Sequence, residues 1–576
     1  MQRHRIATRI VLFVMMGVIF GLSHPAYAQA PEDDVFAVIK ISNPEALLPK
    51  IAALVDKFQP GFGGMINPMM VGNMLFNNPE WTGMDKAGDY TLVVLNPMKY
   101  GSAPFGIIVP LTSKDDYLGA LSQALSGGEE TDGVHHFVLP NQASLCIAPT
   151  ENAGVLSESP ESATVIKSLI DADSSALSVV PVVKGQITAS LSLSKILHTM
   201  QPMIDMVKQQ ALMGVQQEMS QGAEEEKQPQ AEALMGVVES EIDMFFSLLN
   251  QCTDLELAIQ LEDAGLRLSK AVFAAEESAL AAFMEKQVPA KSELLGVFPS
   301  DSALLVSGSI EITPEFQKAY LSFVETLLTV NDTLDDDTVT KTLALLEKSF
   351  EAFGGDFAMA SLSPTSESWL MEVISLKDAD IAKEVFKAYP DMLSSFMGSY
   401  TDPEIDVQMR LGDTQTLESG EVMEYLLDLN TDKIADPEGQ KIFDTLFGDT
   451  FVLPLGVTSD YAVAAFGDEK AVNQLSSIME MLDSGKKIAA EHRPKQFGLP
   501  EKNNMFLYLS LPKILSWLAA KEFSGLPSFE VDAVDSPGIG ASWRFVKSHF
   551  EAEMFIPVDE ILAIKTLIEQ AAPANE

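Results

Sequence analysis

Two patterns of apolar residues recur along this chain. In short runs, apolar and polar residues alternate, which is typical of half-buried strands. In longer runs, apolar residues return every three or four positions, which is typical of amphipathic helices. The order is mostly strand, strand, helix, as in AGDYTLVVLNP, FGIIVPL and TSKDDYLGAL between residues 87 and 121. This order predicts mainly antiparallel sheets with helices laid on one face, an α+β fold.

Short phrases of sequence occur twice along the chain, in the same order both times. LSLSKIL begins at Leu191 and returns as LSLPKIL at Leu509. AGDYTLVVLNP begins at Ala87 and returns as GGDFAMASLSP at Gly354. Further strands and helices follow these phrases in matching order. We therefore predict two homologous tandem domains, each folding around its own apolar core.

Each copy starts its first helix in the same way. Pro44 follows Asn43, and Pro314 follows Thr313. Asn and Thr side chains accept hydrogen bonds from the free N–H groups of a helix start, and proline has no N–H to leave unsatisfied there. In this plan the chain resembles exported bacterial proteins of uncharacterised function, which also open with Pro-x-Asp, a strand and a Pro-started helix. That resemblance implies a fold class and no active-site residues.

The boundary between the copies is expected in the proline-containing stretch KQVPAKSELLGVFPSDS. The first domain then spans residues 29–290 and the second spans residues 291–576. The first copy also carries an insert at about residues 201–250 that the second lacks. Its apolar residues recur every three or four positions on both sides of QGAEEEKQPQ, so we expect a helical hairpin with an acidic tip.

The N-terminus has the three parts of a secretory signal peptide. Arg3, Arg5 and Arg9 precede an uncharged apolar run, and Ala26-Tyr27-Ala28 forms a cleavage site. The alternative is an uncleaved anchor, but the apolar run is shorter than the roughly 20 residues that a membrane-spanning helix needs. We expect residues 1–28 to be removed, no transmembrane segment to remain, and the protein to be periplasmic or extracellular.

The chain is strongly acidic, with a formal net charge of −44. Such a charge repels nucleic acids and anionic lipid headgroups, and it favours solubility, cationic partners or divalent ions. We therefore predict that no nucleic acid is bound.

One loop-like segment of the first copy is unusually apolar. Residues 58–81, FQPGFGGMINPMMVGNMLFNNPEW, concentrate Met, Phe and Trp among Gly, Pro and Asn. Because loops are normally polar, this segment needs a buried or a bound position. Packing between domains, a binding patch and disorder are the three interpretations. The patch would be formed by Phe62, Met65, Met69, Met70, Met74, Phe76 and Trp81.

The predicted helical hairpin offers a second apolar surface. Its stripe could be buried on its own domain, which is the usual position of an amphipathic stripe. Alternatively, its methionines could form an adaptable groove or lid for an apolar ligand or a partner helix, since Met is flexible and polarizable. The contact residues would then include Met203, Met206, Met235 and Phe245.

Two serines have the S-x-x-K spacing of penicillin-recognising serine enzymes. They are Ser192, followed by Lys195, and Ser510, followed by Lys513. Those enzymes also need a K-[ST]-G element, which the chain lacks. Each serine more simply caps the helix that follows it, so we predict no catalytic residue.

Metal and cysteine chemistry is weakly indicated. A calcium-loop pattern lacks its central glycine and its final glutamate, so it predicts at most weak calcium binding; its residues are Asp428, Asn430, Asp432 and Asp436. Cys146 and Cys252 are far from any CxxC or zinc-type spacing. Export would allow them to form a disulfide, and two buried thiols are the equal alternative. We predict no cofactor.

These observations favour a non-enzymatic exported binding protein. Its ligand would be an apolar, lipid-like molecule or a protein partner, contacted by the Met/Phe-rich segments of the first copy. The alternatives are an envelope hydrolase with an unrecognised site and a structural component of the envelope.

Overall fold

The computed structural model describes residues 31–177, 180–222, 242–291, 293–329, 334–361, 368–400, 407–429, 450–467, 471–485, 493–520 and 536–571. The described chain divides into two compact units. The first is built from residues up to 221 and from 242 to 280, and the second continues from residue 281. The predicted signal peptide lies outside the described residues.

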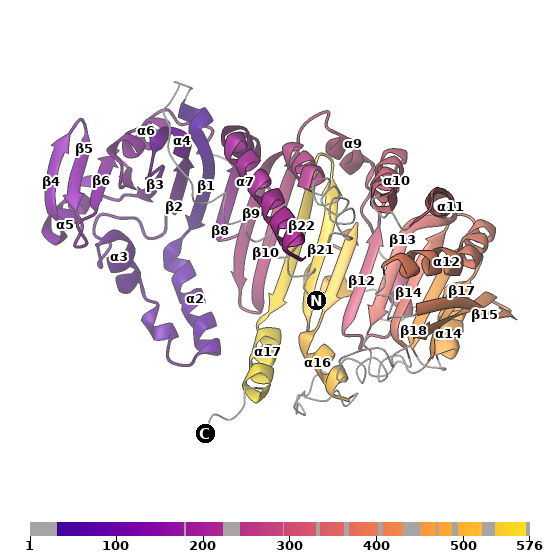
Figure 1. The fold of residues 1–576 in the computed structure, drawn as a ribbon. Coiled ribbons are helices and arrows are strands. Elements are labelled where there is room, and N and C mark those ends of the chain that lie inside the picture. The colour runs from indigo at the N-terminus through magenta and orange to yellow at the C-terminus, as the bar shows by residue number, and fades with distance from the viewer. Residues whose placement is uncertain are drawn as a thin grey trace. The chain divides into compact units, whose positions relative to one another are not determined.

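The first unit is built on an antiparallel sheet (Figure 1). Its strands are β1 (Val35–Ser42), β2 (Asp89–Leu95), β3 (Phe105–Pro110), β4 (Ser126–Thr131), β5 (Val134–Val138), β6 (Ser144–Pro149), β7 (Ala153–Ser157), β8 (Ile187–Ser192), β9 (Cys252–Glu262) and β10 (Gly265–Ala274). Across the sheet they lie in the order β10-β9-β8-β1-β2-β3-β7-β6-β5-β4. The helices are η1 (Pro31–Asp34), α2 (Pro44–Phe58), η2 (Gly63–Met65), α3 (Pro68–Phe76), α4 (Pro97–Tyr100), α5 (Lys114–Ala124), α6 (Pro160–Asp171) and α7 (Leu193–Gly222).

The second unit also has an antiparallel sheet. Its strands are β12 (Leu304–Ser309), β13 (Phe353–Ser361), β14 (Ser368–Leu376), β15 (Val407–Leu417), β16 (Gly420–Leu429), β17 (Thr450–Val457), β18 (Tyr461–Gly467), β20 (Met505–Leu509), β21 (Ile539–Val546) and β22 (His549–Pro557), with a small pair β11 (Ala290–Lys291) and β19 (Lys502–Asn503). The order is β22-β21-β20-β12-β13-β14-β18-β17-β16-β15. The helices are α9 (Ala279–Lys286), η4 (Leu294–Val297), α10 (Pro314–Thr329), α11 (Asp336–Ala352), α12 (Ala379–Tyr400), α14 (Ala471–Ser484), α15 (Arg493–Gln496), α16 (Leu511–Ala520) and α17 (Val558–Ala571).

The two sheets have the same strand order when their strands are counted along the chain. The register agrees as well at the repeated LSL phrase. Ala37 lies opposite Leu191 in the first unit, and Leu304 lies opposite Leu509 in the second. In both units, therefore, the LSL phrase stands at the end of the strand that pairs with the first strand of that unit.

Helices pack on both faces of each sheet, where we expected them on one. In the first unit, Val155 belongs to the cluster under α6, and the next residue, Leu156, belongs to the cluster with Tyr117 of α5. In the second unit, Val422 packs with α14 and Met423 with α12. Successive residues of a strand point to opposite faces, so each sheet is covered from both sides. The fold is α+β, with more helical cover than the strand–strand–helix order predicted.

The predicted helix starts are confirmed. Asn43 Oδ1 accepts a hydrogen bond from the N–H of Ala46 at 3.0 Å, and Thr313 Oγ1 accepts one from the N–H of Phe316 at 3.2 Å. Pro44 and Pro314 are the first residues of α2 and α10.

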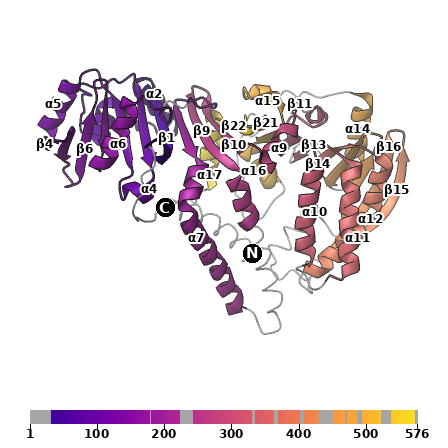
Figure 2. The ribbon, with the colours of Figure 1, turned by 90° about the horizontal axis from the view of Figure 1, so that it is seen from above.

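The insert of the first unit begins differently from our expectation. We expected a separate helix from about residue 201, but α7 runs without a break from Leu193 through Pro202 to Gly222. This long helix projects from the strands of its unit (Figure 2). Residues 242–250 are helical too, and an ion pair between Lys208 and Asp243 joins them to α7. The acidic tip of the predicted hairpin lies outside the described residues.

No helix in the described ranges is both long enough and apolar enough to span a bilayer.

Candidate functional site

Residues 58–81, called here the Met-rich segment, form an ordered turn and a short helix. Asp56 Oδ1 accepts hydrogen bonds from the N–H groups of Gly61 and Gly63, at 3.0 and 2.9 Å. Asn67 then caps α3 by accepting from the N–H of Met70 at 2.9 Å. Polar caps at both turns therefore fix the backbone of a segment whose composition is mostly apolar.

One side of the Met-rich segment is a buried anchor. The rings of Phe76, Trp81 and Tyr90 contact one another with centroids 5.4 to 5.7 Å apart. Trp81 Nε1 donates a hydrogen bond to the carbonyl of Pro68 at 2.6 Å. Gly72 is required here, because a Cβ at this position would come within 2.5 Å of Trp81 Nε1. Phe76 and Trp81, which we predicted to be binding residues, therefore belong to the core.

The other side of the segment is exposed. Five large apolar side chains have between 47% and 69% of their surface accessible to solvent: Phe62, Met65, Met69, Met74 and Leu75. Met70 is half-buried. Single exposed apolar residues are normal on a protein surface, whereas these five lie within 14 residues of sequence and make the segment a candidate interaction surface. Of the predicted patch, the structure leaves Phe62, Met65, Met69 and Met74 available.

The insert also exposes apolar side chains. Met206 and Phe245 are about half exposed, at 51% each, and Met203 is half-buried. Met235 lies outside the described residues.

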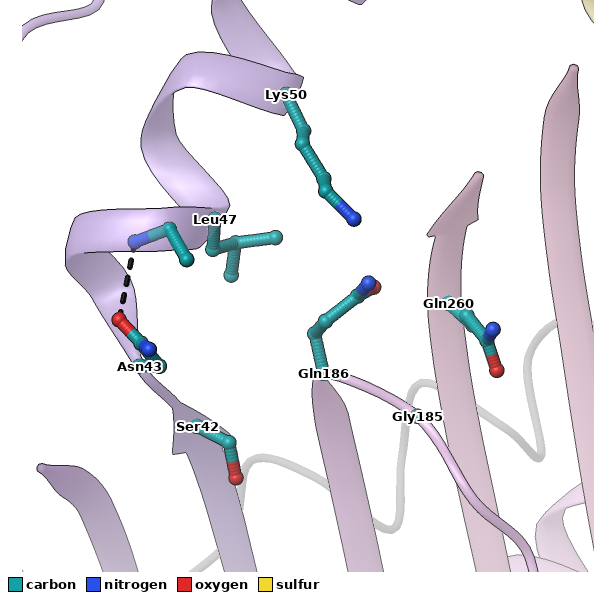
Figure 3. Close-up of a pocket in the computed structure, with 8 residues that line it drawn as sticks. Ser42, Asn43, Leu47, Lys50, Gly185, Gln186 and Gln260 are labelled. Carbon is teal, nitrogen blue, oxygen red and sulfur yellow. Dashed lines mark hydrogen bonds between the residues drawn. The ribbon is translucent and has the colours of Figure 1, made fainter. Parts of the chain in front are cut away.

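A first cavity of about 310 Å³ opens where α2 begins. Leu47 and Lys50 of α2 reach toward it, and Gln186 rises from the segment before β8 (Figure 3). The amide of Gln186 exchanges two hydrogen bonds with the backbone of Leu261, at 2.6 and 3.1 Å. This polar group therefore holds two strand ends together, and Lys50 is the one charged residue of the lining.

A second cavity, of about 380 Å³, lies at the opposite ends of the same strands. We call it the serine–acid cavity. Its polar lining consists of Ser190, Ser192, Lys195, Asp254 and Glu256, and its apolar lining consists of Val35, Phe36, Ala37, Val38, Ala176, Leu191 and Phe273. Apolar walls with a few convergent polar groups are typical of small-molecule sites.

The acids of this cavity were missed by the sequence analysis. A signal was present, because Asp254 and Glu256 alternate with Leu255 and Leu257 and so share one face of β9. At the corresponding positions of the second unit, Gly538 directly precedes β21 and Gly540 lies on it.

The two S-x-x-K serines have different surroundings. Ser510 is fully buried and caps α16, since its Oγ accepts from the N–H of Lys513 at 3.4 Å. Lys513 Nζ donates to the hydroxyl of Tyr508 at 3.1 Å. Ser192 and Lys195 instead line the serine–acid cavity. The capping role that the sequence predicted is therefore seen at Ser510.

The weak calcium pattern falls largely outside the described residues, which exclude Asn430, Asp432 and Asp436. Asp428 is near the end of β16. Within the described ranges, no three His, Cys, Asp or Glu side chains lie close enough together to hold a metal ion.

The two cysteines are separate, buried thiols. Of the two arrangements that the sequence left open, the structure has free thiols rather than a disulfide. Burial raises the pKa of both thiols, although a hydrogen bond from Ser144 partly offsets this at Cys146. A raised pKa disfavours the reactive thiolate form of both cysteines.

Comparison with protein-family models, with curated proteins and with solved structures gave no match.

Proposed function

We propose that this is an exported, non-enzymatic binding protein that arose by tandem duplication, and that its first copy docks an apolar segment of another protein. The Met-rich segment is the contact surface. The observation that carries this proposal is the exposure of Phe62, Met65, Met69, Met74 and Leu75 on a backbone that is anchored from behind.

The duplication is supported by two independent features. The strands of both units follow one order across the sheet, and the LSL phrase keeps the same register against the first strand in each. A repeated sequence alone could reflect similar local structure. Repeated sequence, order and register together favour one ancestral domain copied head to tail.

A protein partner fits this surface better than a lipid bilayer does. The net charge of −44 repels the anionic headgroups of a membrane surface. The five exposed side chains of the Met-rich segment have between 47% and 69% of their surface accessible, so they offer an open surface. Methionine side chains adapt to varied apolar shapes, which suits the apolar face of a helix.

Site-specific photocrosslinking in the source cell tests this proposal. A benzoylphenylalanine placed at Met69 or Met74 should give one discrete protein adduct. The same group at Lys318, an exposed position of α10, should not give that adduct. The double substitution Phe62→Ser and Leu75→Ser should abolish it while changing the free energy of unfolding by less than about 0.5 kcal/mol, because both side chains are exposed.

If Met69 and Lys318 give the same adducts, or if the double substitution leaves the adduct in place, the Met-rich segment is not a docking surface.

The hydrolase alternative has one supporting observation, the position of Ser192 and Lys195 in the lining of a cavity. A fluorophosphonate probe that labels the wild-type protein and not Ser192→Ala would favour it. We expect no labelling of either.

A further inference from the structure

The serine–acid cavity is built on two rows of side chains that cross the sheet. Strand pairing places Val38, Ser190, Glu256 and Ala271 side by side on β1, β8, β9 and β10. The next row on the same face contains Ser192, Asp254 and Phe273. Each row therefore has a serine and an acid at its centre, with apolar side chains flanking them.

Glu256 is buried, with only 6% of its surface exposed, and hydrogen bonds hold its carboxylate in place. Its Oε2 accepts hydrogen bonds from the N–H groups of Val182 and Val183, at 2.6 and 3.4 Å. Glu256 also belongs to the lining of the cavity, so its carboxylate borders the open space.

The same place in the second unit is filled. Its row consists of Leu305, Tyr508, Gly540 and Phe555. The ring of Phe497 covers Gly540, where an added Cβ would come within 2.6 Å of it. Aromatic rings thus occupy in the second unit the space that the first unit leaves open over Ser190 and Glu256.

The lining chemistry defines the ligand class. The lining contains two acids, Asp254 and Glu256, and one lysine, Lys195, so a ligand with one positive charge would balance its formal charge. Phe36 and Phe273 offer apolar and aromatic contact for the body of the ligand. A metal ion fits less well, because the described residues contain no cluster of three such ligands.

We propose that the serine–acid cavity binds a small organic ammonium ion. Its charged group lies against Glu256 and Asp254, and its apolar body lies against the two phenylalanines. The cavity volume of about 380 Å³ is at the lower end of small-molecule pockets, which suits a ligand the size of a single aromatic amine. This site is separate from the Met-rich segment and does not depend on the function proposed for it.

Calorimetric titration of the full chain with 2-phenylethylammonium tests the proposal. The neutral analogue 2-phenylethanol and the anion 3-phenylpropionate serve as matched probes. We expect the ammonium ion to bind at least about ten-fold more tightly than the alcohol, and the anion not to bind, since a charge-assisted hydrogen bond contributes about 1.5–3 kcal/mol.

Two acid substitutions locate the site. Glu256→Gln keeps an oxygen that can accept from Val182 and Val183, and it should weaken ammonium binding by about ten- to a hundred-fold. Asp254→Asn should weaken it as well. Asp263→Asn removes the same charge at the turn after β9, outside the cavity, and should leave binding unchanged.

A filling substitution gives an independent readout. Ser190→Tyr introduces the residue that stands at this place in the second unit, and it should abolish binding of the ammonium ion. The proposal is overturned if the wild-type protein binds the alcohol as tightly as the ammonium ion, if both acid substitutions leave binding unchanged, or if the ammonium ion still binds to Ser190→Tyr.

Discussion

The row around Ser190 in the first unit and the row around Tyr508 in the second occupy the same place in the strand order, but their side chains differ. In the first, Asp254 and Glu256 point from β9 into a cavity. In the second, Gly538 directly precedes β21 and Gly540 lies on it, and a Cβ on Gly538 would come within 2.3 Å of the Tyr508 ring. Glycine makes room for aromatic packing, whereas the acids coincide with an open, polar cavity. A few positions on a shared backbone therefore separate a filled core from a binding cavity.

The polar groups around the LSL phrase, at the ends of β8 and β20, also differ between the two units. In the second unit, Glu560 accepts hydrogen bonds from Ser536 and from the N–H groups of Leu511 and Gly538. Ser536 in turn contacts Ser510 at 3.0 Å. This buried network satisfies its own members. The equivalent end of the first unit leaves Ser192 and Lys195 in the lining of the cavity.

The largest expected effect comes from opening the filled row of the second unit. Phe497→Ala should lower the free energy of unfolding by about 3–5 kcal/mol, because it removes a buried ring and leaves a void over Gly540 and Tyr508. Urea unfolding measures the change. Phe62→Ala, at an exposed position, is the control and should cost less than about 0.5 kcal/mol. Equal losses would mean that Phe497 does not fill a core position.

A smaller effect is expected in the buried network. Glu560→Gln turns an amide N–H₂ toward groups that are themselves donors, so it should cost about 1–3 kcal/mol. The matched control is Glu276→Gln, since Glu276 lies two residues after the end of β10 at an exposed position of the first unit. Urea unfolding of both variants measures the loss in free energy of unfolding at each position. A loss at Glu276 as large as that at Glu560 would contradict the comparison of the two units.

The smallest expected effect depends on pH. Burial raises the pKa of Glu372 on β14, so the folded state holds this proton more tightly than the unfolded state does. The stability that this carboxyl contributes is therefore present below its unfolded pKa of about 4.3 and is lost as the pH rises through the folded value. Glu372→Gln should raise the melting temperature at pH 7 and not at pH 4. A gain at pH 4 equal to that at pH 7 would show that the effect is not electrostatic.

Sequence patterns predicted those parts of the molecule that depend on local backbone chemistry. The Asn43-Pro44 helix start and the strand that ends in the LSL phrase follow from capping and from alternation, which act within a few residues. The extent of the long α7 was harder to predict from the sequence. Pro202 is typical of a helix start, and the helix nevertheless continues through it.

The candidate sites depended on tertiary packing, which composition does not show. Trp81 and Met74 belong to the same apolar segment, yet one is 3% exposed and the other 69%. Contact with the rings of Phe76 and Tyr90 buries Trp81 in the core of the unit. Likewise, Glu256 becomes part of a site because β1, β8 and β10 bring apolar walls beside it.

Superposition of the two units in a crystal structure of the chain tests the central claim most directly. The account predicts that β1, β2, β8, β9 and β10 overlay on β12, β13, β20, β21 and β22 with Leu191 on Leu509. It also predicts that the ring of Phe497 then falls in the space over Glu256. Units that do not superimpose with this register, or a first unit whose cavity is filled by its own side chains, would contradict it.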